Sequence, residues 1–347
     1  MLVYLLVEKS TNILRKLFYI LLLYFSTNLY SQQIINDSII SGGIYRNFIT
    51  YIPSIYQSSE PVPLMFNLHG RTSTAWQQMW YGDFRNVADT ANFIIVHPQG
   101  LLDDSGDTHW NYGQSTVDDI GFFNSLYSYL VSNYSINLDK VYFTGMSNGG
   151  YMSYYLACNM SDKIAAIASV TGAMDSFTQM NCNPSHPTPV MEIHGTSDST
   201  VPFNNIINGI EYWRDYNNCN LIADTILISD LNLLDLSSVE HIVYKNGDNG
   251  VTTELFKVIN GGHTWPGSSI STGVTNYDIN ASAEIWKFFS RYDINGLVMS
   301  TDNRSYSDNI NIVKIVDVLG RKSSISTNEF LLYIYNNGKV SKTIILD

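Results

Sequence analysis

One short segment, residues 141–151, constrains the fold of this chain more than any other, because it predicts a buried strand, a sharp turn and the start of a helix in direct succession. An apolar run leads into Gly145, Ser147 and Gly149, which have the spacing G-x-S-x-G. Glycines at these positions let strand and helix approach closely while the turn lifts the serine hydroxyl above the sheet. The competing interpretation is a glycine-rich helix cap with a surface serine, and the segments that follow favour a nucleophile.

Strand-like and helix-like segments alternate along residues 40–292, so we predict an α/β fold in which a mostly parallel sheet is flanked by helices. Residues 221–239 show no clear period and are interpreted as an insertion. The expected strands are residues 44–52, 64–68, 93–97, 141–146, 164–170, 189–194 and 253–259, and the expected helices are residues 84–90, 117–131, 151–158, 203–216 and 281–292.

Two loops after predicted strands carry the residue types that would activate Ser147. Asp198 lies in the glycine-led loop that follows residues 189–194, and His263 lies in the glycine-rich loop that follows residues 253–259. The chain order Ser, Asp, His is the order that this architecture uses, so we predict His263 as the general base and Asp198 as the group that orients its imidazole. The alternative for Asp198 is an ordinary Asx-turn residue.

A turn after an early strand is predicted to stabilise the charge that develops on an attacked carbonyl. His69 and Gly70 follow the apolar strand at residues 64–68. In this architecture an N–H group just past such a glycine lies beside the nucleophile, so we predict the backbone N–H of Arg71 as one donor of an oxyanion hole. Taken alone, the pair is also compatible with a plain turn at the end of a strand.

Two tryptophans in loops are predicted to bind substrate. Trp110 lies in a loop rich in Asp, Gly and Asn, and Trp265 follows closely after His263. Loops at the carboxyl ends of parallel strands collect ligand groups, so both indoles are expected to line a cleft, with ordinary loop packing as the alternative for Trp110. The adjacent Asp118 and Asp119 begin a predicted helix and are interpreted as capping carboxylates rather than as an acid/base pair.

Charge and composition exclude several classes of function. The chain of 347 residues has 31 acidic and 19 basic side chains, a net charge of -12 and a pI near 4.9. Nucleic acid and anionic membrane surfaces repel such a chain, so a neutral substrate is expected. The three cysteines form neither a C-x-x-C pair nor a cluster with histidine, so no metal site is predicted and no cofactor is implied.

The N-terminus predicts export. Lys9, Arg15 and Lys16 precede an apolar run at residues 17–25, which is followed by small and polar residues. This is the order of a secretory signal peptide, here cleaved near Ser31, so we expect a secreted protein without a stable membrane anchor. A transmembrane anchor is the alternative, although the apolar run is shorter than the ~20 residues that span a bilayer.

Export would permit a disulfide between two of the three cysteines, Cys158, Cys182 and Cys219. The odd count leaves one thiol unpaired. We favour the pair Cys158 and Cys182, since Cys158 ends the helix after the predicted nucleophile and Cys182 precedes the next strand.

Together these segments resemble the poly(3-hydroxybutyrate) depolymerase and feruloyl or acetyl-xylan esterase group of secreted α/β-hydrolases. The resemblance implies hydrolysis of carboxylic esters by Ser147, Asp198 and His263 as a triad, with the N–H of Asn148 as a further oxyanion donor and no cofactor. It implies as substrate an ester of a plant cell-wall polysaccharide or a hydroxyalkanoate oligomer. The matching segments are residues 68–70, 117–122, 145–150, 194–198, 201–202 and 262–267.

The chain departs from the pattern of that group in two respects. Residues 239–253 lack the further cysteine that many members carry, which leaves Cys219 without a predicted partner. An additional substrate-binding domain, common in enzymes that attack solid polyester, is not visible, so solid polymer is a less expected substrate.

The last fifty or so residues shift to an Asn- and Ser-rich composition with alternating strand patterns and a hairpin signal at Asn337-Gly338. They resemble the C-terminal sorting domain of the type IX secretion system, a small β-module read by the export machinery. A carbohydrate-binding or merely structural appendage is the alternative. We therefore divide the chain into a signal peptide at residues 1–31, an α/β-hydrolase domain at residues 32–297 and a sorting domain at residues 298–347.

The sequence thus predicts an extracellular serine esterase that acts through an acyl-enzyme and is exported through the periplasm, with attachment to the cell surface left open. A serine peptidase is the rival within the enzymes, because fold and triad are shared by both. A non-catalytic secreted binding protein is the rival from another class. The acyl group, the alcohol and the oligomeric state are not predicted.

Overall fold

The computed structural model describes residues 32–298, 312–317, 321, 323, 330–335 and 340–344. The chain divides into two compact units, Met1–Val298 and Met299–Asp347. The predicted signal peptide lies outside the described residues. Among those residues, no helix combines the length and the apolar character that crossing a bilayer requires.

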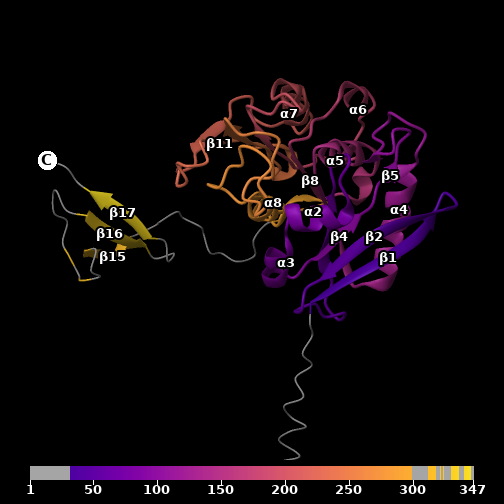
Figure 1. The fold of residues 1–347 in the computed structure, drawn as a ribbon, viewed down its shortest axis with the longest axis horizontal. Helices are drawn as coiled ribbons and strands as arrows, with labels where there is room; N and C mark the ends of the chain where they lie inside the picture. The colour runs from indigo at the N-terminus through magenta and orange to yellow at the C-terminus, as the bar shows by residue number, and fades with distance from the viewer. Residues whose placement is uncertain are drawn as a thin grey trace, which may run out of the picture. The chain divides into compact units, whose positions relative to one another are not determined.

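A ten-stranded sheet organises the described part of the first unit (Figure 1). Its central strands run parallel from β4 to β12, and antiparallel strands complete both sides. Parallel pairing brings the carboxyl ends of the central strands to one edge of the sheet, where loops can assemble a site. Across the sheet the strands are β1 (Gln33–Ser41), β2 (Ile44–Ile52), β4 (Ile94–Pro98), β3 (Val62–Leu68), β7 (Ile136–Met146), β8 (Ala166–Val170), β9 (Val190–Gly195), β12 (Thr253–Ile259), β11 (Ser238–Tyr244) and β10 (Asp224–Leu227).

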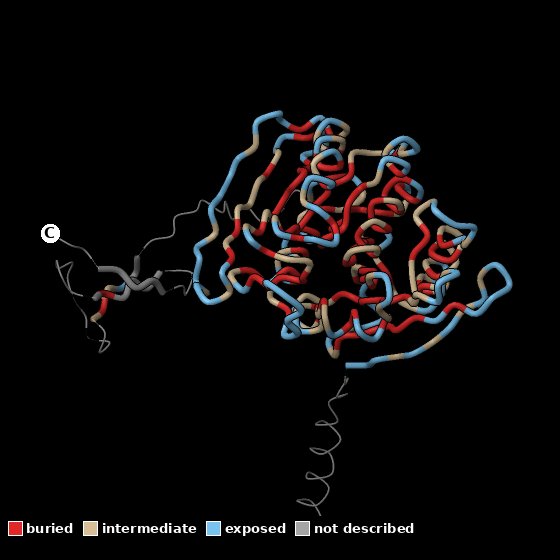
Figure 2. The backbone as a smooth tube through the Cα atoms, turned by 45° about the horizontal axis from the view of Figure 1, so that its top comes forward, coloured by how far each residue is buried: buried red, intermediate tan, exposed pale blue. Residues whose placement is uncertain are grey.

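Successive side chains of a strand point to opposite faces of the sheet, and in the central strands the side chains on both faces are apolar. Helices therefore cover both faces. Leu64 and Phe66 of β3 pack in one core cluster with residues of α4 and α5, and Met65 packs in a second cluster with residues of α3 and α8. Figure 2 shows the resulting buried interior. The helices are α2 (Ala75–Tyr81), α3 (Arg85–Ala91), α4 (Asp119–Asn133), α5 (Asn148–Asn159), α6 (Ser176–Met180), α7 (Asn204–Tyr216) and α8 (Ala281–Phe289).

The predicted α/β class, with a mostly parallel sheet between helices, is confirmed. Among the strands and α-helices longer than two residues, β1, β10, β11 and the short helices α2 and α6 were not predicted. The segment interpreted as an insertion, residues 221–239, instead contains β10 and the start of β11, which extend the sheet at one side. Two short ribbons also occur, β5 (Leu101–Leu102) with β6 (Thr108–His109), and β13 (Tyr292–Asp293) with β14 (Gly296–Leu297).

The described part of the second unit is a three-stranded antiparallel sheet of β15 (Ile312–Asp317), β16 (Phe330–Tyr335) and β17 (Val340–Ile344). Strand β16 lies in the middle and pairs with both neighbours. The predicted hairpin turn at Asn337-Gly338 falls between β16 and β17 and lies outside the described residues.

Candidate active site

Ser147 occupies the turn between β7 and α5. Its φ of 52° and ψ of -119° lie in a region that a residue with a side chain adopts only at a cost of about 1–3 kcal/mol. The turn is held in place because the Ser147 N–H donates to the carbonyl of Val170 at 2.8 Å. A strained strand-to-helix turn of this kind is typical of a nucleophile elbow, in which the serine hydroxyl is raised above the sheet.

Close packing explains the two glycines of the motif. A Cβ atom placed on Gly145 would lie 2.7 Å from the carbonyl carbon of Gly149, and one placed on Gly149 would lie 2.4 Å from the carbonyl oxygen of Leu68. Cβ atoms do not approach backbone atoms this closely. Helix α5 can therefore lie against β3 and β7 only with glycine at both positions.

The structure brings Asp198 and His263 together from two different loops. His263 Nδ1 lies 2.7 Å from Asp198 Oδ2, while Asp198 Oδ1 accepts the backbone N–H groups of Thr200 at 2.8 Å and Val201 at 2.9 Å. Burial alone would raise the pKa of Asp198, but the hydrogen bonds from His263 and from the backbone outweigh it and lower that pKa. Asp198 is therefore a carboxylate at neutral pH that fixes the orientation of the His263 ring.

Ser147 and His263 line the same cavity, whose volume is about 780 Å³. Helix α2 supplies an aromatic wall to this cavity through Trp76, Trp80 and Tyr81. Trp76 and Trp80 are 50% and 41% exposed, and their ring centroids lie 5.9 Å apart in an edge-to-face arrangement. The wall is well suited to contact an apolar or aromatic part of a substrate.

A second cavity, of about 510 Å³, also includes Ser147 in its lining. Its walls are more polar and include Asp103 together with Tyr112 and Tyr151. The two tyrosine rings stack with centroids 5.1 Å apart and an interplanar angle of 21°. Ser147 thus lines two cavities, of which the second, called here the polar cavity, is the more polar, so the two sides of a substrate would meet different chemistry.

Both residues predicted as oxyanion donors line the second cavity. Arg71 lines both cavities, and a Cβ atom on the preceding Gly70 would lie 3.4 Å from Ser147 Cβ, which places this turn against the nucleophile. Among the described residues, no acceptor is found for the Arg71 backbone N–H, whereas the next N–H, that of Thr72, donates to the Thr108 carbonyl. Asn148 begins α5, and N–H groups in the first turn of a helix have no acceptor within it.

The two tryptophans expected in the cleft are both buried, each with 1% of its surface exposed. Trp265 packs edge to face on Phe84 and donates from Nε1 to Ser282, so the expectation that it forms an aromatic wall is corrected: α2 supplies that wall. Trp110 borders the polar cavity, but its Nε1 donates inward to the His69 carbonyl at 2.9 Å. Its indole is therefore committed to holding the loops around the site.

The amide side chain of Asn148 links the nucleophile turn to the Trp110 loop. Its Oδ1 accepts the Trp110 backbone N–H at 2.6 Å, and its Nδ2 donates to the Trp110 carbonyl at 3.1 Å. His69 supports the same region, because its Nε2 accepts the Gly100 N–H at 2.9 Å. Burial lowers the pKa of His69 to about 4, so this histidine is a neutral structural group and not a second base.

A buried pair that the sequence did not predict lies behind the acid. Glu192 and His194, both from β9, are buried, and His194 Nδ1 lies 3.0 Å from Glu192 Oε1. On its other side His194 Nε2 donates to the Val201 carbonyl at 2.8 Å and lies 3.5 Å from Asp198 Oδ2. Burial opposes a charge on His194, but Glu192 and the carbonyl outweigh it and raise the pKa of the imidazole.

The two adjacent aspartates have separate structural roles. Asp118 caps α4 by accepting the Gly121 N–H at 2.8 Å, as the sequence predicts. Asp119 instead points into the core, where Arg46 of β2 donates to it at 2.5 Å and the Asn111 N–H donates at 2.7 Å. Asp119 thus forms a buried ion pair with Arg46 and, through its bond to the Asn111 N–H, links the Trp110 loop to the sheet.

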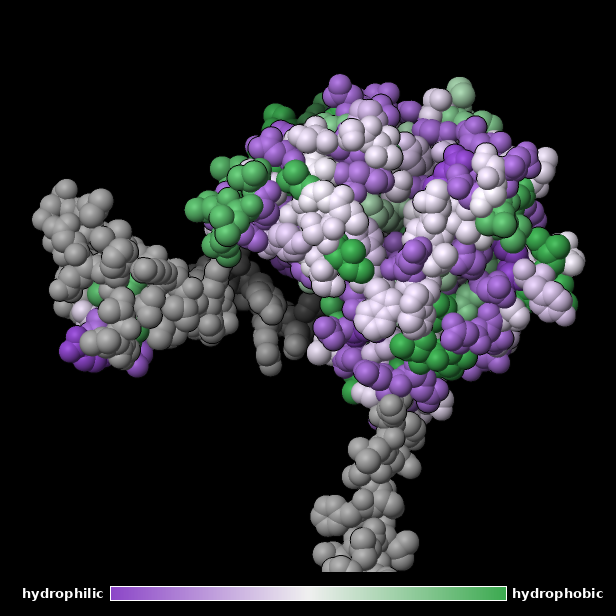
Figure 3. All heavy atoms as spheres, in the orientation of Figure 1, coloured by the Kyte–Doolittle hydropathy of each residue, from purple (hydrophilic) through white to green (hydrophobic). Residues whose placement is uncertain are grey.

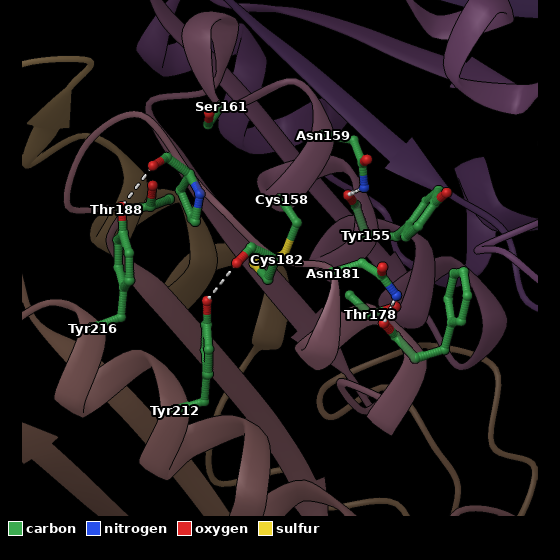
Figure 4. The surroundings of a disulfide bond; sticks show 12 residues. Tyr155, Cys158, Asn159, Ser161, Thr178, Asn181, Cys182, Thr188, Tyr212 and Tyr216 are labelled. Atoms are coloured by element: carbon green, nitrogen blue, oxygen red, sulfur yellow. Dashed lines mark hydrogen bonds between the residues drawn. A yellow bond between two sulfur atoms is a disulfide. The ribbon is translucent and has the colours of Figure 1, made fainter.

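The structure contains the disulfide between Cys158 and Cys182 that the sequence analysis favours, with Cα atoms 4.7 Å apart (Figure 4). The bond joins the end of α5 to the segment before β9, and the hydroxyl of Tyr212 donates to the Cys182 carbonyl at 3.2 Å. Cys219 is a buried free thiol. In the described ranges of the chain, no group of three or more His, Cys, Asp and Glu side chains is arranged to hold a metal ion.

Comparison with known proteins places the fold in a familiar class. The chain has the α/β-hydrolase fold: it superposes on an acetyl xylan esterase from Aspergillus awamori with a TM-score of 0.55 and 15% identity, over 75% of this chain and 99% of that one. Residues 118–226 match the phospholipase/carboxylesterase family.

Among curated proteins the chain is similar to named esterases. It is 27% identical over 271 residues to a bifunctional acetylxylan esterase/xylanase of Neocallimastix patriciarum, covering 78% of this chain and 36% of that protein. It is 28% identical over 165 residues to feruloyl esterase B of Piromyces equi, covering 46% of this chain and 30% of that protein. The alignments therefore span about a third of the length of these two relatives.

Proposed function

We propose that this chain is a secreted serine esterase that hydrolyses carboxylic esters through an acyl-enzyme. The observation that carries the proposal is the 2.7 Å contact between His263 and Asp198 at a cavity that also contains the strained Ser147. A serine raised on such a turn and a histidine oriented by a carboxylate are the two parts that nucleophilic acyl transfer requires.

In the proposed mechanism Ser147 Oγ attacks the ester carbonyl and His263 Nε2 takes the hydroxyl proton. The negative charge on the carbonyl oxygen is stabilised by the backbone N–H groups of Asn148 and Arg71. The intermediate expels the alcohol, which receives the proton from His263, and leaves an acyl group on Ser147. Water, deprotonated by His263, then attacks the acyl carbonyl, and as the bond to Ser147 Oγ breaks His263 returns the proton to that oxygen and the carboxylic acid leaves. Asp198 orients the imidazole and stabilises its cation throughout.

The proposed substrates are esters of plant cell-wall polysaccharides, because the named relatives are acetylxylan and feruloyl esterases. An aromatic wall on one side of Ser147 and a polar cavity on the other suit an ester that joins an acyl group to a sugar. Hydroxyalkanoate oligomers, the substrates of depolymerases with related motifs, are the competing choice.

We further propose that residues 1–31 direct export and that residues 298–347 form a sorting module read by a type IX secretion system. The separate compact unit and its antiparallel sheet support this assignment of the C-terminal part. Deleting residues 298–347 is expected to retain the enzyme in the periplasm of a host that has this secretion system. Unchanged release into the medium would contradict the assignment.

The esterase proposal is tested with the purified chain and a panel of p-nitrophenyl acetate, methyl ferulate, acetylated xylan and soluble 3-hydroxybutyrate oligomers. Turnover of at least one ester, and its loss in Ser147→Ala, are expected. Labelling of Ser147 by a fluorophosphonate gives an independent reading of the nucleophile. Peptide cleavage with inert esters would favour a serine peptidase, and an unreactive Ser147 would favour a binding protein.

A further inference from the structure

The outer side of β10 and the loop after it form an apolar ridge, defined here as residues 221–236. Figure 3 shows hydrophobic side chains gathered on this part of the surface, beside the strand labelled β11 in Figure 1. Single exposed leucines need no partner, whereas a contiguous set of this size marks an interaction surface. The exposed fractions are 73% for Leu221, 86% for Ile222, 51% for Ile226, 74% for Leu227, 82% for Leu231, 73% for Leu233, 91% for Leu234 and 74% for Leu236.

Backbone hydrogen bonds anchor the ridge to the rest of the first unit. The N–H groups of Leu231 and Asn232 donate to Asp278 Oδ1 at 2.7 and 3.0 Å. Asp235 in turn accepts the backbone N–H of Tyr277 at 2.8 Å. The loop therefore presents its leucines from a fixed backbone, and little conformational entropy would be lost when they are covered.

Strand β10 is also an unprotected edge of the sheet. It ends the strand order next to β11, and within the described ranges no other strand pairs with its outer side. Its residues Asp224–Leu227 include neither the lysine nor the proline that commonly protects such an edge. At the opposite end of the strand order β1 also pairs on one side only, and α4 packs beside it, where the Tyr129 hydroxyl donates to Asp37 at 2.5 Å. Exposed residues alternate with partly buried ones along β1, whereas all four residues of β10 are exposed.

We propose that the apolar ridge is a self-association surface, on which a second copy of this chain pairs its own β10 antiparallel to the first and covers the exposed leucines. A two-fold axis relates two identical edges that pair antiparallel. The free backbone N–H and C=O groups of each β10 then bond to those of the other copy, and no unpaired edge remains. Each of the eight aliphatic side chains contributes on the order of 100 Å² of exposed apolar surface, so the patch measures roughly 800 Å². That is about what each partner of a standard stable interface buries.

The charges of the ridge favour a second copy over charged partners. Residues 221–236 contain no lysine or arginine, so nothing there attracts an anionic lipid surface or nucleic acid. Two of its three carboxylates are already engaged: Asp224 pairs with Lys245 at 2.8 Å, and Asp235 accepts from Ser237. A two-fold axis at Thr225 would set Asp224 opposite Ile226 of the second copy, and one at Ile226 would set it opposite Ile228, so like charges do not face each other.

The test is the mass of the purified full chain in solution, measured by sedimentation velocity at low-micromolar concentration. A dimer is expected. Leu227→Lys combined with Leu234→Lys should give a monomer, with the dissociation constant raised by at least ~100-fold because lysines would be buried without partners. The control is Met180→Lys, an equally exposed position of α6 outside the ridge, which should remain a dimer. Thermal unfolding checks that both variants fold.

A second measurement identifies the contact itself. Single substitutions Thr225→Cys and Ile226→Cys place a thiol near the two-fold axis, and mild oxidation should link two chains in at least one of these variants. A wild-type monomer, or a dimer that Leu227→Lys with Leu234→Lys leaves intact, would overturn the proposal. If the wild-type monomer adsorbs to apolar polymer particles and the lysine variant does not, the ridge binds a polymer surface instead.

Discussion

At Ser147 a strained backbone and two glycines form one unit, because the turn that raises the hydroxyl also forces α5 against β3. Gly149→Ala would put a methyl carbon 2.4 Å from the Leu68 carbonyl oxygen. The backbone must move to relieve this contact, so we expect a loss of about 2–3 kcal/mol in the free energy of unfolding, together with most of the esterase activity. Urea denaturation and ester turnover measure the two effects.

The comparison for this prediction is Gly106→Ala. Gly106 has a φ of 84° but open space where a Cβ atom would stand. Only the left-handed backbone opposes alanine there, and the expected cost is about 1 kcal/mol with activity retained. If Gly149→Ala proves as mild as Gly106→Ala, the close approach of α5 to β3 is not as described.

His194 is predicted to position the acid rather than to touch substrate. Its imidazole, whose pKa is raised by Glu192 and by the Val201 carbonyl, faces Asp198 Oδ2 and that carbonyl. His194→Gln removes the imidazole that can carry a positive charge beside the Asp198–His263 pair, so this pair should take up a proton more readily and the activity should disappear on the acid side at a pH higher by ~1 unit. The measurement is kcat/KM against pH for a soluble ester.

Tyr154→Phe is the matched control for His194. It removes the hydroxyl that donates to Glu192 Oε2 at 3.0 Å but leaves every charge of the network in place. The acid limb of its pH profile should therefore stay where it is in the wild type. If His194→Gln lowers kcat/KM equally at all pH values, His194 only supports the loop.

At the level of elements, the sequence predicts strands and helices that have a regular apolar pattern, and it misses elements that are too short to show one. The parallel strands are continuous apolar runs buried on both faces, and such runs are readable without a structure. Helix α2 spans only residues Ala75–Tyr81, and β10 is exposed along its whole length, so neither has a period to detect. The signal that remained was the spacing of Trp76 and Trp80, which lie on one face of a helix.

The residues of the candidate site likewise divide into those whose position the sequence predicts and those it does not. The places of Ser147, Asp198 and His263 in the fold were predictable because each follows a strand whose end the pattern reveals. The aromatic wall was assigned to Trp265, since a tryptophan beside the base is the nearest candidate in sequence. Only the packing of Trp265 against Phe84 shows that this indole faces the core. Which side chain turns outward depends on tertiary contacts, and periodicity does not report these.

Helix α2 is predicted to set the preference for the acyl group. Trp76 is 50% exposed at the cavity, so Trp76→Ala should leave the fold intact while removing an aromatic face. We expect kcat/KM for methyl ferulate to fall about tenfold and that for p-nitrophenyl acetate to change by less than about twofold. Tyr45→Ala, at a strand position 72% exposed and outside both cavities, is the control and should affect neither ester. Equal losses for both esters would mean that Trp76 does not discriminate between acyl groups.

For the molecule as a whole, acid stability of the first unit depends on a buried carboxylate in β12. Glu254 has 1% of its side chain exposed and accepts from Arg291 at 2.5 Å, His241 at 2.8 Å and Thr252 at 2.7 Å. Burial alone would raise its pKa, but these partners outweigh it and lower the pKa from 4.5 to about 2. The carboxylate thus ties the sheet to the segment that follows α8.

Because the pKa of Glu254 is lowered in the folded state, its contribution is complete above about pH 4.5 and is lost as the pH falls through about 2. We expect Glu254→Gln to lower the free energy of unfolding by about 3 kcal/mol at pH 7, and this difference from the wild type should shrink steadily below pH 4.5. Urea denaturation of both proteins between pH 7 and about 2.5 measures the difference. Arg291 is 39% exposed and can be hydrated when its partner is removed, so the variant should still fold. A difference that stays constant across this range would show that Glu254 acts through packing and not through its charge.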